Sequence, residues 1–230
     1  GILGKPNSGK STYFNAILKD KRSIVSSTPG TTRDAISELI SFKGIELKIT
    51  DTAGLRKKSK VNDEIEKSSV NQAIKTMRAS EGIIYLIDGK ESISDQDLHL
   101  ISLSISSGKP LVIGINKSET LDKYEKTTIR RDLNRRLAFA KDLDIKYISA
   151  KNKYGTSALI SNILSLIRKS KEVLNPKFVN KVFLDAYDKN PPPMVGRFRP
   201  KIKFVKNLDI QPPTFIIHGN KIESLSKQYL

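Results

Sequence analysis

Cysteine is absent from the 230-residue sequence, and aromatic residues make up only 7% of it. The absence of cysteine excludes disulfide bonds and thiolate metal sites, and it is compatible with a reducing cytoplasm. Long apolar runs are missing as well. The longest, 82–87 and 111–115, have the length of buried strands and fall far short of the ~18 residues that indicate a membrane span. We therefore expect a globular, cytoplasmic protein without a membrane segment.

Acidic residues are scarce, with 24 Asp+Glu against 41 Lys+Arg and a formal net charge of +17. A basic surface gains affinity for phosphate backbones through counterion release, which favours nucleic acid as a partner. An AT-rich genome also loads protein surfaces with lysine, and the composition fits that explanation equally well. Histidines are few, and we expect His99 and His218 to have surface or packing roles rather than catalytic ones.

The clearest motif is a phosphate-binding loop at residues 4–12, which reads G-K-P-N-S-G-K-S-T. Gly4 and Gly9 permit backbone angles and close approaches that side chains would block, so that successive N–H groups can face a phosphate. Lys10 would place its charge across the β- and γ-phosphates, and the Ser11 hydroxyl would be a ligand of Mg²⁺. A helix beginning at Lys10 would turn its positive dipole end toward the same anion. Such a turn also arises by chance, so the motif needs its context.

Strands and helices alternate along the first 170 residues. The apolar periodicity predicts βαβ units and a largely parallel sheet covered on both faces, with one antiparallel hairpin. The stretch 20–34 is too rich in turn formers for regular structure. The expected strands are 1–3, 36–42, 45–51, 82–88, 111–116 and 145–149, and the expected helices are 10–19, 64–78, 94–107, 126–141 and 158–168.

The pattern of expected helices and strands changes near Ser170. Asn175 and Pro176 have the residue types of a helix cap and a first helical position, so we expect a helix over 177–189. The other expected elements are strands over 201–206 and 214–218 and a helix from about 224.

Two domains are therefore predicted. Residues 1–170 form an α/β domain with a doubly wound sheet of the P-loop NTPase type, and residues 171–230 form a small α+β domain. The second domain carries 11 Lys+Arg and 5 Asp+Glu, a net charge of +6, and is the more basic per residue.

Four further motifs fall at strand ends or in the loop between them, where a doubly wound sheet places its ligands. Asp51 offers a carboxylate to Mg²⁺, Gly54 offers an N–H to the γ-phosphate, and Thr32 offers a hydroxyl that could close over the metal. Residues 116–119, N-K-S-E, would hold a purine base, and residues 149–151, S-A-K, would brace it. Each motif alone is weak, but all of them in this order predict a domain that binds GTP or GDP and hydrolyses GTP.

The expected site residues form three groups. Nucleotide contacts are expected from Gly4, Lys5, Pro6, Asn7, Ser8, Gly9, Lys10, Ser11, Thr12, Asp51, Thr52, Ala53, Gly54, Leu55, Asn116, Lys117, Ser118, Glu119, Ser149, Ala150 and Lys151. Mg²⁺ ligands are expected from Ser11, Thr32 and Asp51, and direct contributions to hydrolysis from Lys10, Thr32 and Gly54.

The stretches P-G-T-T-R-D at 29–34 and D-T-A-G-L at 51–55 resemble those of the TrmE–Era branch of GTPases. Within it the chain is similar to the Der (EngA) family of bacterial ribosome-assembly GTPases, through K-K-S-K-V at 57–61, D-Q-D at 95–97 and N-P-P-P at 190–193. The resemblance covers nearly every residue. It implies the second GTPase domain of that family and a KH-like domain incomplete at its C-terminus, with a first GTPase domain before this chain. The implied partners are the large ribosomal subunit and its RNA, and we expect a monomer.

The sequence departs from the patterns of such proteins in three places. Glu119 stands where the family carries Asp, and its extra methylene must be accommodated beside guanine. Residues 171–230 lack the G-x-x-G loop by which KH domains hold a nucleic-acid backbone. Leu55 replaces the water-orienting Gln of Ras-type enzymes, so the resemblance implies a K⁺ ion held partly by Asn7. Asn7 alternatively serves only as a turn residue.

Three interpretations remain open. The chain is a Mg²⁺-dependent, K⁺-stimulated GTPase switch in large-subunit assembly, or a nucleotide-regulated RNA-binding module with incidental hydrolysis. In the third, it senses nucleotide state while hydrolysis belongs to another GTPase domain. The basic residues Arg197, Arg199, Lys201 and Lys203 would then contact either ribosomal RNA or another domain.

Overall fold

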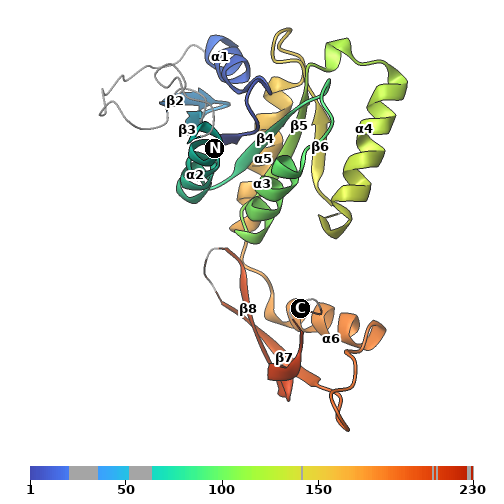
Figure 1. Ribbon diagram of the computed structural model, residues 1–230. Coiled ribbons are helices and arrows are strands. Elements are labelled where there is room, and N and C mark those ends of the chain that lie inside the picture. The colour runs from blue at the N-terminus through green and yellow to red at the C-terminus, as the bar shows by residue number, and fades with distance from the viewer. Residues whose placement is uncertain are drawn as a thin grey trace. The chain divides into compact units, whose positions relative to one another are not determined.

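The computed structural model of the chain (Figure 1) describes residues 1–20, 36–51, 64–140, 142–208, 210, 212–226 and 229. The chain divides into two compact units, Gly1–Arg168 and Lys169–Leu230. Part of the expected site, including Thr32 and residues 52–55, lies outside the described residues. In the described part of the chain, no helix is both long and apolar enough to cross a membrane.

The first unit is built on a six-stranded sheet with the strand order β2-β3-β1-β4-β5-β6. β2 and β3 form an antiparallel hairpin with Ile36 opposite Asp51 and Phe42 opposite Ile45, and all the other neighbours are parallel. This arrangement confirms the predicted mostly parallel α/β sheet. The strands are β1 (Ile2–Leu3), β2 (Ile36–Phe42), β3 (Ile45–Asp51), β4 (Ile83–Asp88), β5 (Leu111–Asn116) and β6 (Asp144–Tyr147).

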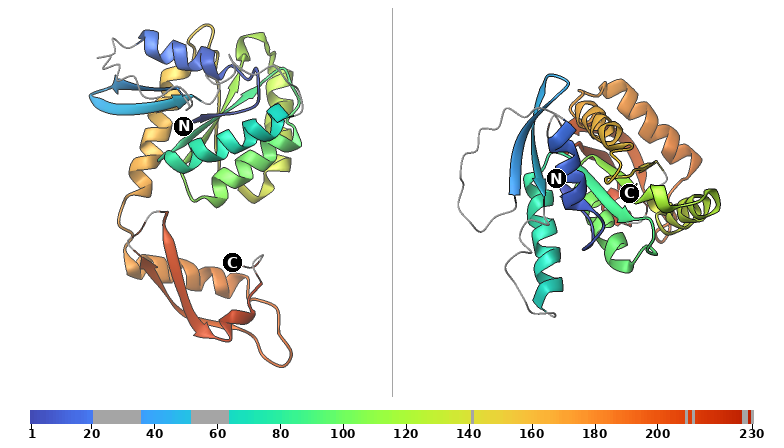
Figure 2. Two further views of the ribbon diagram at one scale, coloured as in Figure 1. Left: turned by 60° about the vertical axis from the view of Figure 1, so that its left-hand side comes forward. Right: turned by 90° about the horizontal axis from the view of Figure 1, so that it is seen from above.

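Helices cover both faces of the sheet (Figure 2), which creates two apolar cores. Successive residues of β4 alternate between them: Ile83, Tyr85 and Ile87 pack on one face, and Ile84 and Leu86 on the other. Helices α2, α3 and α4 contribute to the first core, and α1 and α5 to the second. The helices are α1 (Lys10–Asp20), α2 (Glu64–Ala79), α3 (Asp95–Ser106), α4 (Lys123–Arg136) and α5 (Thr156–Ser170), with short 3-10 turns η2 (Ser118–Thr120) and η3 (Ala138–Ala140).

Two expected helices are placed differently in the structure. The helix expected over 126–141 begins at Lys123 and ends at Arg136, because Asp122 and Glu125 form a capping box that fixes its start. The helix expected from about 224 is not present in the described residues there. Ile222–Ser224 is instead a 3-10 turn (η4), and the next two residues are not helical.

The second unit consists of α6 (Pro176–Lys189) and an antiparallel hairpin of β7 (Lys201–Leu208) and β8 (Thr214–Asn220). As predicted, Asn175 caps α6 by accepting a hydrogen bond from Lys177 N, and Pro176 is its first residue. One face of the hairpin packs on α6 around the buried residues Val179, Ile202 and Val205. The Asn180 side chain, on α6, accepts a 2.6 Å hydrogen bond from Val205 N.

Candidate functional site

The loop between β1 and α1 lies too close to its surroundings to carry side chains at two positions. Gly4, Asn7 and Gly9 have φ angles of 142°, 63° and 92°. A Cβ atom on Gly4 would lie 2.2 Å from Leu86 O, and one on Gly9 would lie 2.0 Å from Asn116 Nδ2. The two glycines are therefore required by contacts with β4 and with the last residue of β5 as well as by their backbone angles.

Lys10 folds back over this loop. Its side chain is buried, and its Nζ donates a 2.5 Å hydrogen bond to Lys5 O. Ser11, which follows in the first turn of α1, is exposed. The Ser8 hydroxyl is buried and has no hydrogen-bond partner among the described residues. A cationic group, an exposed hydroxyl and an unsatisfied polar atom thus gather where the helix begins.

Asn116, at the carboxyl end of β5, joins three segments that are far apart in the sequence. Its Nδ2 donates a 2.9 Å hydrogen bond to Ser8 O, and its Oδ1 accepts one of 2.9 Å from Ala150 N. Ser118 N also donates to Ile148 O at 3.0 Å. The 4–12 loop, the end of β5 and the 149–151 turn are thereby held together by buried groups.

Lys117 adopts a left-handed backbone conformation (φ 62°), and its Nζ forms an ion pair with the buried Asp88 carboxylate. Asp88 also accepts a 3.0 Å hydrogen bond from Lys90 N. Sequence reasoning missed Asp88. The available signal was its position as an acidic residue at the carboxyl end of a buried strand, the same position that Asp51 and Asn116 hold.

Glu119 is exposed on the 3-10 turn η2. Ser118 and Leu121, on either side of it, are buried and anchor the turn. No hydrogen bond or ion pair within the described residues engages the Glu119 carboxylate, so this group is free to accept hydrogen bonds from a ligand.

Asp51 is buried at the end of β3, where it lies opposite Ile2 of β1. No group of three or more His, Cys, Asp or Glu side chains among the described residues could hold a metal ion. Such a group is not needed for Mg²⁺, which typically binds through one or two carboxylates, waters and substrate phosphates. The oxygens of Asp51 and Ser11 are of the type that Mg²⁺ prefers, so the residues present fit this ion.

The remaining expected contacts surround this centre. Ser149 is buried and its hydroxyl accepts a 3.1 Å hydrogen bond from Asn152 N, whereas Lys151 is exposed. Tyr13, just beyond the loop, donates a 3.1 Å hydrogen bond to Thr156 O. Burial raises the pKa of the Tyr13 hydroxyl, so it stays protonated and ties α1 to α5. Thr52, Ala53, Gly54 and Leu55 lie outside the described residues.

Comparison with known families defines the class of protein. The family described as 50S ribosome-binding GTPase matches residues 1–117, and the KH-domain-like C-terminal family of EngA bacterial GTPase enzymes matches residues 174–230. The chain belongs to the 50S ribosome-binding GTPases, and its second unit is a KH-like domain of the EngA type.

Individual relatives narrow the family further. The chain is 37% identical to GTPase Der of Nitrosococcus oceani and 36% identical to GTPase Der of a Polaromonas species, over 99% of its own length in both cases. It covers 49% and 51% of those proteins, so it spans about half the length of the curated relatives it matches. These matches confirm the resemblance to Der that the sequence motifs indicate.

Solved structures support the fold. The chain resembles Era in complex with MgGDPNP and a segment of 16S ribosomal RNA, with a TM-score of 0.56 and 23% identity over 95% of this chain and 76% of that one. The elongation factor SelB of Methanococcus maripaludis, in complex with the GTP analogue GppNHp, gives a TM-score of 0.58 and 17% identity over 77% of this chain and 35% of that one.

Proposed function

We propose that this chain binds GTP and GDP with Mg²⁺, hydrolyses GTP with stimulation by K⁺, and acts as a switch during assembly of the large ribosomal subunit. The observation that supports the nucleotide part is the Asn116 side chain, which links the 4–12 loop to the 149–151 turn by two hydrogen bonds. A preformed link of this kind keeps the phosphate and base contacts in register before the ligand arrives.

The phosphates would bind at the beginning of α1. The 4–12 loop places backbone N–H groups and the positive end of the helix dipole at this point. Lys10 would exchange its bond to Lys5 O for phosphate oxygens, and the free Ser8 hydroxyl offers a further polar contact. Bound Mg²⁺ would neutralise phosphate charge, with Ser11, Asp51 and Thr32 as its proposed ligands.

The base would bind beside the turn that follows β5. The exposed Glu119 carboxylate would accept hydrogen bonds from guanine N1–H and N2–H₂, which are donors that adenine does not present in the same positions. The Lys117 stem, held by Asp88, would lie along the base. Ala150 would brace the opposite side through the turn that Asn116 fixes.

Hydrolysis needs fixed positive charge against the developing γ-phosphate charge. Leu55 can neither orient the attacking water nor supply positive charge. We therefore assign part of the positive charge to a K⁺ ion held partly by Asn7. The left-handed conformation of Asn7 fits a turn role, but its side chain is exposed and hydrogen-bonds to no described residue. Its amide oxygen is therefore available to a cation.

Turnover of GTP by the 230-residue chain, in K⁺ and in Na⁺ at equal ionic strength, tests the catalytic proposal. We expect faster hydrolysis in K⁺ and loss of the difference in Asn7→Ala. Asn15→Ala, which removes an exposed amide from α1, is the matched control and should behave as the unaltered chain. A rate that is indifferent to the cation would refute the Asn7 assignment. Nucleotide binding without any hydrolysis would favour the RNA-binding or nucleotide-sensing interpretation.

The ribosomal part of the proposal is supported by the family description and by the Der relatives. Cosedimentation with large subunits, with a non-hydrolysable GTP analogue or with GDP, tests it. We expect association that differs between the two nucleotide states. Association that is equal in both states would reject the switch, and no association would reject the ribosomal partner.

A further inference from the structure

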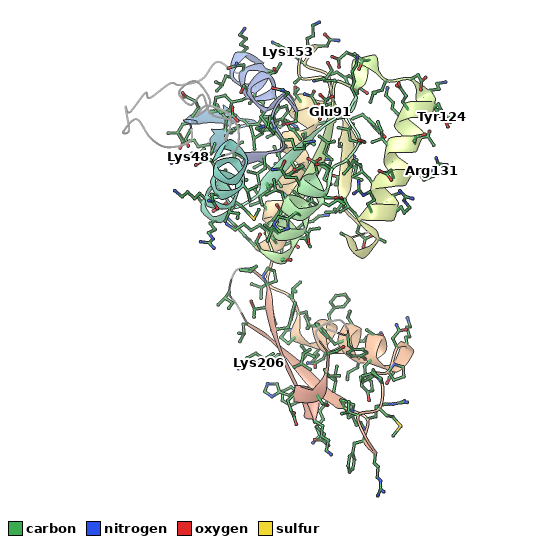
Figure 3. All side chains as sticks on the ribbon, in the orientation of Figure 1. Lys48, Glu91, Tyr124, Arg131, Lys153 and Lys206 are labelled. Carbon is green, nitrogen blue, oxygen red and sulfur yellow. The ribbon has the colours of Figure 1, made fainter. Side chains whose placement is uncertain are left out.

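The face of the β7–β8 hairpin that points away from α6 is not covered by any described residue of the second unit. Ile202 and Val205 point to α6 and are buried, whereas Phe204 and Lys206 lie on the opposite face and are exposed. Figure 3 shows Lys206 extending from the hairpin on the side away from α6. Residues opposite these two on β8 are His218 and Ile216, so four side chains from two strands share this outer face.

The centre of the outer face is a flat aromatic platform. The rings of Phe204 and His218 stack with their centroids 4.3 Å apart and an interplanar angle of 13°. Phe204 nevertheless remains 47% exposed, and Ile216 beside it is 40% exposed. A cross-strand ring pair of this kind stabilises a hairpin, but that role alone does not need an open ring surface.

The strand that carries Phe204 also carries exposed lysines. Lys201, Lys203 and Lys206 lie on β7, and neither strand contains Asp or Glu. The nearest acidic residue in the sequence is Asp209, which lies outside the described residues. At its end β8 leads into Lys221, whose Nζ lies 3.2 Å from the centroid of the Phe198 ring. The two strands of the platform thus carry exposed lysines and no carboxylate.

We propose that this outer face binds an unpaired segment of RNA, with a base stacked on Phe204 and the lysines contacting the neighbouring phosphates. The choice of RNA rests on the ribosomal part of the proposed function. Stacking of bases on aromatic side chains in a basic groove or sheet is how proteins bind single strands, and every base offers a π face. Because neither strand carries a carboxylate, no acidic side chain of β7 or β8 would repel the phosphates.

A second copy of the chain fits this face less well. In a two-fold dimer the same patch would meet itself, and its three lysines would be brought toward the three lysines of the partner copy without any acid to pair with them. An apolar partner would bury ammonium groups without compensation. A polyanion with exposed bases satisfies both the rings and the charges.

The test uses the 230-residue chain and a labelled oligouridylate of about ten nucleotides, within the site size of single-strand binders. Binding is followed by fluorescence anisotropy at several salt concentrations. Phe204→Ala should weaken binding roughly 5- to 150-fold, because stacking contributes about 1–3 kcal/mol per base. Phe204→Tyr keeps a ring and should bind as the unaltered chain does. Lys206→Ala should flatten the slope of log affinity against log salt by about 0.7.

Matched controls come from α6. Phe178 is a 63% exposed phenylalanine and Lys181 an exposed lysine of the same unit. Phe178→Ala and Lys181→Ala should leave affinity and salt slope unchanged. Circular dichroism of each variant checks that the unit remains folded, and duplex RNA of equal length should bind more weakly because its bases cannot reach the ring.

Equal affinities for Phe204→Ala and the unaltered chain would overturn the proposal, as would equal losses in Phe178→Ala. No binding of the oligouridylate at low salt would overturn it as well. So would a dimer, seen by light scattering, that Phe204→Ala dissociates. GDP affinity measured on the same variants should not change and reports separately on the nucleotide site. Loss of GDP binding throughout, with the Phe204 effect intact, would reject the nucleotide proposal and leave this one standing.

Discussion

In the first unit polar side chains are buried at strand ends, whereas in the second unit large apolar side chains are exposed. Every buried polar or charged residue of the described chain lies within Gly1–Arg168. Of the thirteen large hydrophobic residues that are exposed in the described ranges, nine lie in the much shorter second unit. Val173, Phe178 and Phe204 are among them.

The difference has a physical cause. Burying a polar group is costly unless it is paired, so a network such as Ser8, Asn116 and Ala150 fixes the geometry of the loops it joins. Among the described residues of the second unit, the core cluster has three buried apolar residues, Val179, Ile202 and Val205, and six further apolar side chains are only partly buried against it. The described part of the first unit therefore has loops held in fixed geometry by buried polar groups, whereas that of the second unit presents exposed apolar side chains.

The largest effect should come from the charged group of the first unit. Lys10→Ala should weaken GDP and GTP binding by about 3–6 kcal/mol, because two charge-assisted hydrogen bonds to phosphates are lost at about 1.5–3 kcal/mol each. Calorimetry measures this. Lys19→Ala, at the exposed end of α1, is the control and should bind normally. Unchanged affinity in Lys10→Ala would remove the phosphate assignment.

The next effect concerns the network itself. Asn116→Ala leaves Ser8 O and Ala150 N buried without their partners, which should lower the free energy of unfolding by about 2–6 kcal/mol at roughly 1–3 kcal/mol per group. Urea unfolding measures the loss, and GDP affinity should fall in the same variant. Asn152→Ala removes an exposed amide and should change neither. A stable Asn116→Ala protein with normal GDP binding would mean that the link is dispensable.

Base recognition should respond to the length of one side chain. Glu119→Ala should weaken guanine nucleotides by about 2–4 kcal/mol, since two donors of guanine lose a charged acceptor. Glu119→Asp should bind GDP more tightly than the unaltered chain, because it restores the shorter side chain typical of the family. If Asp at this position binds GDP more weakly, the turn has adapted to the longer carboxylate and the strained interpretation is wrong.

The smallest effect is a pH dependence of stability that comes from Tyr13 in the first unit. The pKa of Tyr13 is raised in the folded state by burial, so the folded protein keeps this proton above the ordinary pKa of about 10. The contribution of the Tyr13 proton to the free energy of unfolding is full below about pH 10. Above that pH it falls by up to about 1.4 kcal/mol per pH unit. Tyr13→Phe should reduce this alkaline slope in urea unfolding. Equal alkaline slopes in Tyr13→Phe and the unaltered chain would contradict the assignment.

Local patterns in the sequence were sufficient for much of the fold. The ranges of β2 and β3, the Asn175 cap and the glycine positions of the 4–12 loop could be predicted because each depends on neighbouring residues. The start of α4 was predictable in principle from Asp122 and Glu125, a capping box that the apolar pattern does not reveal.

Contacts between distant residues were not predictable in the same way. The Lys117–Asp88 ion pair depends on the parallel register that places Asp88 beside Asn116. The stacking of Phe204 on His218 depends on a register shift between Ile202 and Phe204, which decides which β7 residues face outward. One strand alone carries no signal for either contact.

The central claim is that the Asn116-linked loops form a guanine-nucleotide site. Calorimetric titration of GDP and of ADP into the 230-residue chain with Mg²⁺ tests it most directly. The account predicts one GDP bound per chain and much weaker binding of ADP, which lacks the donors that pair with Glu119. Equal affinity for the two nucleotides, or no binding of GDP, would contradict it.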